Sequence, residues 1–96
     1  MSMTYVLSPM AEADLEDIWA YTAETWSVEQ AEIYTNDIIN VFEELAEGQK
    51  KGRPIEVREG YVKALIGRHA IYFQVRGEVI AIIRILHQSM DVERHL

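Results

Sequence analysis

Residues 69–86 read HAIYFQVRGEVIAIIRIL, and this stretch decides the fold. It holds two apolar runs, His69–Val75 and Val79–Leu86, on either side of a turn centred on Gly77. A third run, Tyr61–Ile66, precedes them across a two-residue turn. Runs of β-branched and aromatic residues bounded by such short turns predict an antiparallel three-stranded meander.

Alternation along the last strand predicts which of its side chains share a face of the sheet. A strict period of two places one set on the first face, namely Val79, Ala81, Ile83 and Ile85. The opposite face then receives Ile80, Ile82, Arg84 and Leu86. A charge among aliphatic side chains is expected either on an open sheet face or in a pair.

Helical signals occupy the first half of the chain, after a short strand at Thr4–Leu7. Ser8-Pro9 is a typical helix start, and the apolar positions that follow have helical spacing: Ala11, Leu15, Ile18, Trp19, Thr22 and Trp26. The spacing of Ser27 and Gln30 matches a capping box and predicts a second helix that ends before Gly48. Glu47–Gly60 is expected to be a linker.

These elements predict an α+β fold in the order β-α-α-β-β-β, with residues 1–96 forming one domain. The helical hairpin must pack on one face of the small antiparallel sheet, because neither element can bury its apolar side alone. The other face can remain partly open.

Composition excludes several classes of protein. The chain has no cysteine, which rules out disulfides and zinc–thiolate sites and fits a reducing cytoplasm. No signal peptide and no membrane-spanning run is visible. The net charge is −7, and residues 1–52 carry −9 against +2 for residues 53–96. This acidic balance argues against direct nucleic-acid binding, which needs a basic surface.

Four kinds of chemical site can be weighed from the residues. A Ser-His-Asp triad from His87, Ser89 and Asp91 is disfavoured, because residues two apart on an extended segment rarely converge end to end. The chain's histidines (His69, His87, His95) lack metal-ligand spacing, so no metal is expected, and the isolated glycines form no phosphate loop. An acid–base site for RNA would draw on Arg58, Lys63, Arg68, Arg84, Tyr61 and Tyr72. Basic residues that keep a sheet face solvated, or that bind a protein, explain the same pattern more simply.

Four segments resemble the ParE branch of the RelE/ParE toxin superfamily. They are Tyr5–Pro9 with Ala13–Trp19, then Gly67–Phe73, Ile83–Asp91 and the closing Arg94–Leu96. The resemblance covers essentially the whole chain and implies the toxin of a type II toxin–antitoxin module, of the kind that stabilises plasmids or chromosomes. ParE-type toxins inhibit DNA gyrase without being enzymes and need no cofactor, and a ParD-type antitoxin neutralises them.

The RelE branch of the superfamily offers the alternative function, cleavage of mRNA on the ribosome. That branch carries an arginine in the middle strand, where this chain has Ala70 in the segment His69–Ile71. The missing arginine and the acidic balance both argue against ribonuclease activity. An inactive protein-binding relative is the third possibility.

The resemblance also implies two binding surfaces. The target-inhibiting surface is expected at the end of the last strand and in the tail: His87, Gln88, Ser89, Met90, Asp91 and Arg94. The antitoxin is expected to use an apolar trough between hairpin and sheet and a basic strand face, contacting Trp26, Tyr34, Arg58, Arg68 and Arg84. Arg84 is expected to form the desolvated ion pair with the antitoxin, whereas Trp19 is expected to be core.

Overall fold

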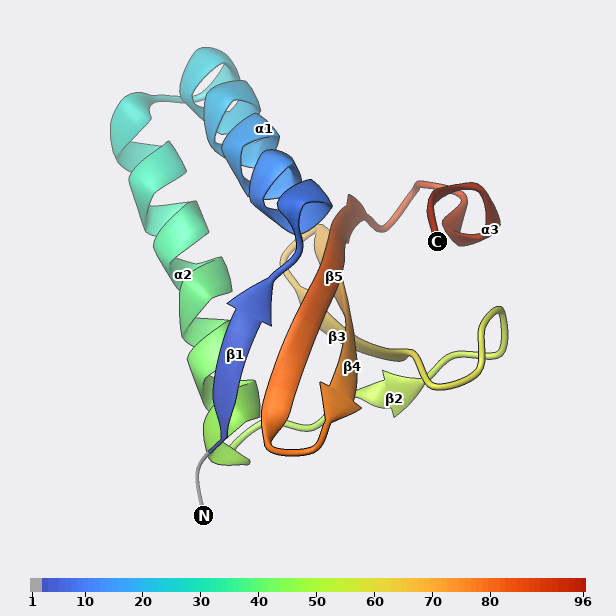
Figure 1. Ribbon diagram of the computed structural model, residues 1–96. Coiled ribbons are helices and arrows are strands. Elements are labelled where there is room, and N and C mark those ends of the chain that lie inside the picture. The colour runs from blue at the N-terminus through green and yellow to red at the C-terminus, as the bar shows by residue number, and fades with distance from the viewer. Residues whose placement is uncertain (1–2) are drawn as a thin grey trace.

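A five-stranded mixed sheet carries a helical hairpin on one face (Figure 1). The computed structural model describes residues 3–96, so the first two residues of the predicted domain lie outside the described range. The elements are β1 (Thr4–Leu7), α1 (Pro9–Thr25), α2 (Val28–Glu47), β2 (Arg53–Pro54), β3 (Val62–Ile66), β4 (His69–Arg76), β5 (Val79–His87) and α3 (Val92–His95). The strand order across the sheet is β1-β5-β4-β3-β2.

The predicted meander is confirmed, since β3, β4 and β5 pair antiparallel in sequence order. The expectation that the whole sheet is antiparallel is wrong at one edge, where β1 pairs parallel with β5. The helical hairpin carries the chain away from β1, and the meander then brings its last strand back beside it. Thr4 is aligned with Val79 and Leu7 with Ile82.

The predicted linker Glu47–Gly60 contains a strand that the sequence did not indicate. In β2, Arg53 pairs with Lys63 and Pro54 with Val62. Two residues without apolar alternation give no strand signal, and proline is tolerated here because β2 is an edge strand. Gly52 lies so close to β3 that a Cβ on it would meet the Lys63 carbonyl oxygen at 2.8 Å.

Both predicted helix starts are confirmed by their caps. The Ser8 hydroxyl accepts the N–H of Ala11 at 3.0 Å, and the Ser27 hydroxyl accepts the N–H of Gln30 at 2.9 Å. Such caps satisfy N–H groups that have no partner within the helix. The second helix ends at Gly48, whose φ of 79° suits the left-handed cap that glycine adopts without strain.

The main core lies between the hairpin and the sheet. Its fully buried side chains include Ile38 and Phe42 from α2 and Ile71 and Ile82 from the sheet. Burying each aliphatic or aromatic side chain of this kind contributes about 1.5–3 kcal/mol. This packing fixes the hairpin against the sheet.

A β-bulge in β5 changes the predicted alternation. Tyr72 is paired with Arg84 but Phe73 with Ile82, so Ile83 is the extra residue. An extra residue reverses the side-chain alternation beyond it. Ile80, Ile82 and Ile85 therefore belong to the helix-facing core, and the prediction that Ile85 faces opposite to Ile80 and Ile82 is wrong.

A second, smaller core lies on the other face of the sheet, where α3 packs (Figure 1). It contains Ala70, Tyr72 and Leu86, covered by Ile55, Val92 and Leu96. The Asp91 side chain caps α3 by accepting the N–H of Glu93 at 3.1 Å. Within residues 3–96, no helix is long and apolar enough to cross a membrane.

Candidate functional site

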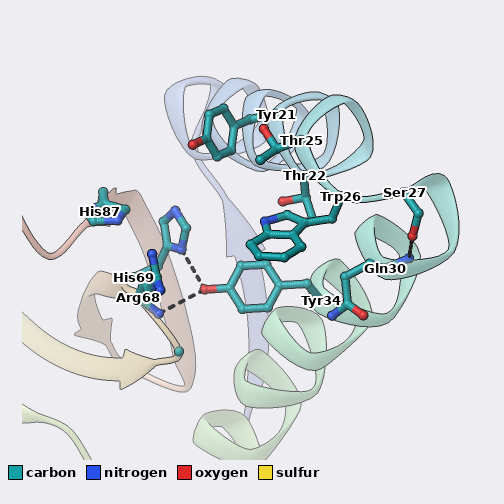
Figure 2. Close-up of a pocket in the computed structure, with 11 residues that line it drawn as sticks. Tyr21, Thr22, Thr25, Trp26, Ser27, Gln30, Tyr34, Arg68, His69 and His87 are labelled. Atoms are coloured by element: carbon teal, nitrogen blue, oxygen red, sulfur yellow. Dashed lines mark hydrogen bonds between the residues drawn. The ribbon is translucent and has the colours of Figure 1, made fainter.

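A cleft of about 670 Å³ opens between the far end of the helical hairpin and the turn that joins β3 to β4 (Figure 2). Its volume lies in the range of ordinary ligand pockets. The hairpin contributes aromatic, hydroxyl and amide groups, and the sheet contributes cationic and imidazole groups. The lining residues are Tyr21, Thr22, Thr25, Trp26, Ser27, Gln30, Tyr34, Gly67, Arg68, His69 and His87.

The aromatic wall of the cleft comes from the hairpin. Trp26 leaves 73% of its surface exposed and Tyr21 leaves 68%, although both are large apolar side chains. Aromatic side chains of this kind are common anchors in protein interfaces. Trp19 lies elsewhere, in a shallower groove with Glu12 and Glu16, and its 36% exposure shows that the expectation of a core residue was wrong.

Tyr34 connects α2 to the β3–β4 turn. Its hydroxyl lies 2.6 Å from Nδ1 of His69 and 3.2 Å from the Ile66 carbonyl oxygen, and it accepts the N–H of Arg68 at 3.2 Å. Burial raises the pKa of this phenol, so it remains protonated. The turn can approach so closely only because residue 67 is glycine, where a Cβ would lie 2.7 Å from the Tyr34 hydroxyl.

Two imidazole rings meet at the sheet side of the cleft. His69 and His87 are direct cross-strand partners, and their ring centroids are 5.3 Å apart. The pKa of His69 is lowered mainly by burial and to a lesser degree by the neighbouring His87. Nδ1 of His87 lies 2.7 Å from the Ser89 hydroxyl, yet Asp91 is committed to the cap of α3, so the three residues do not form a triad.

Nothing in residues 3–96 groups three or more metal-ligating side chains. The third histidine, His95, lies in α3, on the far side of the sheet from the hairpin. The prediction that no metal is bound stays a prediction.

The structure divides the predicted target-inhibiting residues among three places. His87 lines the cleft. Gln88 supports the β3–β4 turn, since its side-chain amide donates to the Gly67 carbonyl at 2.9 Å. Ser89 contacts His87, and Met90 is 45% exposed in the connection to α3. Asp91 and Arg94 belong to the cap and body of α3.

The predicted antitoxin-binding residues are also divided. Trp26, Tyr34 and Arg68 line the cleft together, which sequence spacing alone had not established. Arg58 lies on the connection between β2 and β3, stacked over the Tyr61 ring at 5.7 Å, and does not line the cleft.

Arg84 has an internal partner in place of the antitoxin carboxylate expected for it. Its Nε and Nη2 atoms donate to the two carboxylate oxygens of Asp14 at 2.8 and 2.9 Å, and Nη1 donates to the His95 carbonyl at 3.1 Å. The hydrogen bond to Asp14 raises the pKa of Arg84. The Asp14 carboxylate also accepts the N–H of Ile85 at 2.9 Å, so it completes the edge of β5 beyond the end of β1.

Only some of the residues considered for RNA chemistry lie together. Lys63, Tyr72 and Arg84 follow one another across neighbouring strands, whereas Arg68 lies in the cleft. Tyr72 is only 3% exposed, and burial raises the pKa of its phenol. The buried phenol is a poor general base, and the guanidinium of Arg84 is held by Asp14.

Fold and comparisons together define the class. The model of the family described as ParE toxin of type II toxin-antitoxin system, parDE, matches residues 5–92. Toxin ParE1 of Mycobacterium tuberculosis is 43% identical over 98 residues, covering 100% of both chains. Toxin ParE1 of Caulobacter vibrioides is 43% identical over 93 residues, covering 96% of each. The chain therefore belongs to the ParE toxin family of type II toxin–antitoxin systems.

Solved structures agree with this assignment. The chromosomal ParDE TA system from P. aeruginosa contains a chain with a TM-score of 0.79 and 27% identity, covering 90% of this chain and 96% of that one. The toxin–antitoxin complex RelBE2 from Mycobacterium tuberculosis matches with a TM-score of 0.66 at 18% identity, over 91% and 99% of the two chains, and shows the shared fold alone.

Proposed function

We propose that this ParE-type toxin inhibits DNA gyrase by binding it in the cytoplasm, without an enzymatic step, and that a ParD-type antitoxin neutralises it. The observation that carries the proposal is the combination of the family with the dispersal of the acid–base candidates. Tyr72 is buried, Arg84 is paired with Asp14, and Arg68 lies in the cleft. A nuclease needs such groups converged on one substrate phosphate.

The cleft is the proposed docking site of the antitoxin. Trp26 offers a large exposed apolar surface, Tyr34 a partly buried ring, and Arg68 a positive charge at the rim. An apolar anchor in such a trough, with a carboxylate on the arginine, is a common pattern for a segment that wraps its partner. Arg58 would add a peripheral charge that acts mainly on the association rate.

The surface that binds the target is proposed to extend from His87 to α3, away from the cleft. Met90 and Arg94 are exposed, and the run from His87 to Asp91 leads from the cleft to α3. A surface that starts in the antitoxin cleft would let the antitoxin hinder the target from binding.

The activity is tested with purified toxin in two assays. Inhibition of DNA supercoiling by gyrase is expected, with no cleavage of ribosome-bound message at toxin concentrations below that of the ribosome. Message cleavage at sub-stoichiometric toxin, with supercoiling unaffected, would establish the RelE-like function instead. Inactivity in both assays would identify an inactive protein-binding relative.

Docking is tested with matched tryptophan variants. Trp26→Ala is expected to weaken antitoxin binding by at least about tenfold, mainly through faster dissociation. Trp19→Ala removes the chain's other tryptophan, which lies outside the cleft, and should leave the affinity within about twofold. Equal losses in both variants would show that the antitoxin binds elsewhere.

A further inference from the structure

The sheet end of the cleft is cationic in a strongly acidic protein. The chain carries 16 acidic residues, and eleven of them precede residue 53. No aspartate or glutamate is among the residues that line the cleft, although most of the lining comes from that acidic half. Arg68, His69 and His87 lie together at the sheet end (Figure 2). Such an arrangement favours the binding of an anionic group at the sheet end of the cleft.

Hydrogen-bond directions show which ring nitrogens carry protons. Nδ1 of His87 accepts the backbone N–H of Ser89 at 3.1 Å, which places the proton of the neutral ring on Nε2. The Tyr34 hydroxyl accepts the N–H of Arg68, and it lies 2.6 Å from Nδ1 of His69 and 3.2 Å from the Ile66 carbonyl oxygen, so two acceptors compete for its hydrogen. When the hydroxyl donates to Nδ1, the neutral His69 ring carries its proton on Nε2. Each neutral ring has one N–H donor that its neighbours leave unused.

The network around His69 can take one more proton without moving a heavy atom. If Nδ1 of His69 becomes protonated, it donates to the Tyr34 hydroxyl. That hydroxyl then turns its own hydrogen toward the Ile66 carbonyl oxygen, which already lies at 3.2 Å. Every donor and acceptor in the group keeps a partner, so the hydrogen-bond network can accommodate the protonated form of His69.

We propose that Arg68, His69 and His87 form a carboxylate-binding subsite for an acidic side chain of the antitoxin, and that filling it takes up a proton on His69. The inference rests on the proposed docking of the antitoxin in the cleft. The subsite adds two features to that docking: an acidic antitoxin side chain at the sheet end of the cleft, and an affinity for the antitoxin that depends on pH.

The sign of the pH dependence follows from the charges that surround His69. In the free toxin, burial and the neighbouring His87 keep the pKa of His69 below 6.5, so the ring is neutral near pH 7. A carboxylate within about 4–6 Å favours the charged form and opposes both effects. Affinity should therefore rise as the pH falls from 8 to 6, by up to about tenfold per pH unit for one proton. The ionisable groups that face or lie near this network are Tyr34 and Asp37 of α2, Tyr21 of α1, His87 of β5 and Arg68 of the turn.

The test is calorimetry of the toxin with its co-expressed antitoxin after the two are separated and refolded. Titrations at pH 6.5 in buffers of different ionisation enthalpy give the number of protons taken up on binding. Uptake of up to one proton is expected for the wild type and for His95→Gln, since His95 lies in α3. His69→Gln should abolish the uptake. Tyr34→Phe keeps the phenyl ring but removes the hydroxyl that accepts the hydrogen bond of the protonated Nδ1 of His69, and should reduce the uptake.

Two results overturn the inference in distinguishable ways. Tight binding with no proton uptake, and with equal affinity at pH 6 and pH 8, would refute the subsite while leaving antitoxin docking intact. Wild-type affinity in Trp26→Ala would instead show that the antitoxin does not use the cleft, and the subsite would fail together with the docking proposal.

Discussion

The ion pair between Asp14 and Arg84 is expected to be a main determinant of stability, and Asp14→Ala tests it. The carboxylate accepts hydrogen bonds from Nε and Nη2 of Arg84 and from the backbone N–H of Ile85. Removing it leaves a guanidinium whose side chain is only 12% exposed, together with an unpaired strand edge. It also removes the hydrogen bonds that join α1 to β5.

The expected loss can be worked out from these contacts. Breaking a buried ion pair by removing one partner costs about 3–5 kcal/mol, because the other charge stays desolvated. Both side chains keep some contact with water, at 12% and 14% exposure, so the lower end applies. A loss of about 3 kcal/mol corresponds to a fall in melting temperature of roughly 12–24 °C for a domain of this size.

Urea and thermal unfolding of four variants would measure this. Asp17→Ala removes an exposed carboxylate of the same helix and should cost less than about 0.5 kcal/mol. The double variant Asp14→Ala/Arg84→Met should be more stable than the sum of its single changes by about 1 kcal/mol or more, because no unpaired charge remains. If Asp14→Ala unfolds at the same denaturant concentration as Asp17→Ala, the pair does not stabilise the fold.

Three further predictions concern the turn, the tail and the imidazole. Gly67→Ala should destabilise by about 2 kcal/mol or more, because φ is 54° and the new Cβ would meet the Tyr34 hydroxyl; Gly77→Ala, with φ of 63° in open space, should cost about 1 kcal/mol in the same melts. Deleting Val92–Leu96 should abolish toxicity in a growth assay and leave antitoxin affinity within about tenfold, whereas equal loss of both would mean that the tail is only structural. Because the folded-state pKa of His69 is below the unfolded value of 6.5, the free toxin should lose stability as pH falls below 6.5, and less so in His69→Gln; equal pH profiles in urea unfolding would contradict this.

Local signals predicted most of the fold. Serine caps, the proline at the first helical position and the glycine at the helix end act within a few residues, so Ser8, Ser27 and Gly48 marked their elements correctly. The meander followed from short turns in the same way. The parallel pairing of β1 with β5 depends on residues about 75 positions apart, and no local pattern indicates it.

The site was harder to predict because its features arise from tertiary contacts. The bulge at Ile83 reversed the alternation on which the faces of β5 were assigned. Arg84 was interpreted as a partner-binding residue because its partner, Asp14, lies 70 positions away. The cross-strand register that joins His69 to His87 likewise became evident only in the folded chain, although the proximity of both to strand ends was a usable signal.

The position of β5 has a consequence for how the toxin is made. This strand lies between β1 and β4, so the sheet can be completed only after β5 has left the ribosome. Until it arrives, the first strand has no neighbour and the apolar faces of both helices lack Ile80, Ile82 and Ile85. Pairing over such a separation is slow compared with local folding. The toxin fold therefore forms only once β5 has been made, and a chain truncated before Val79 should be harmless to the cell that makes it.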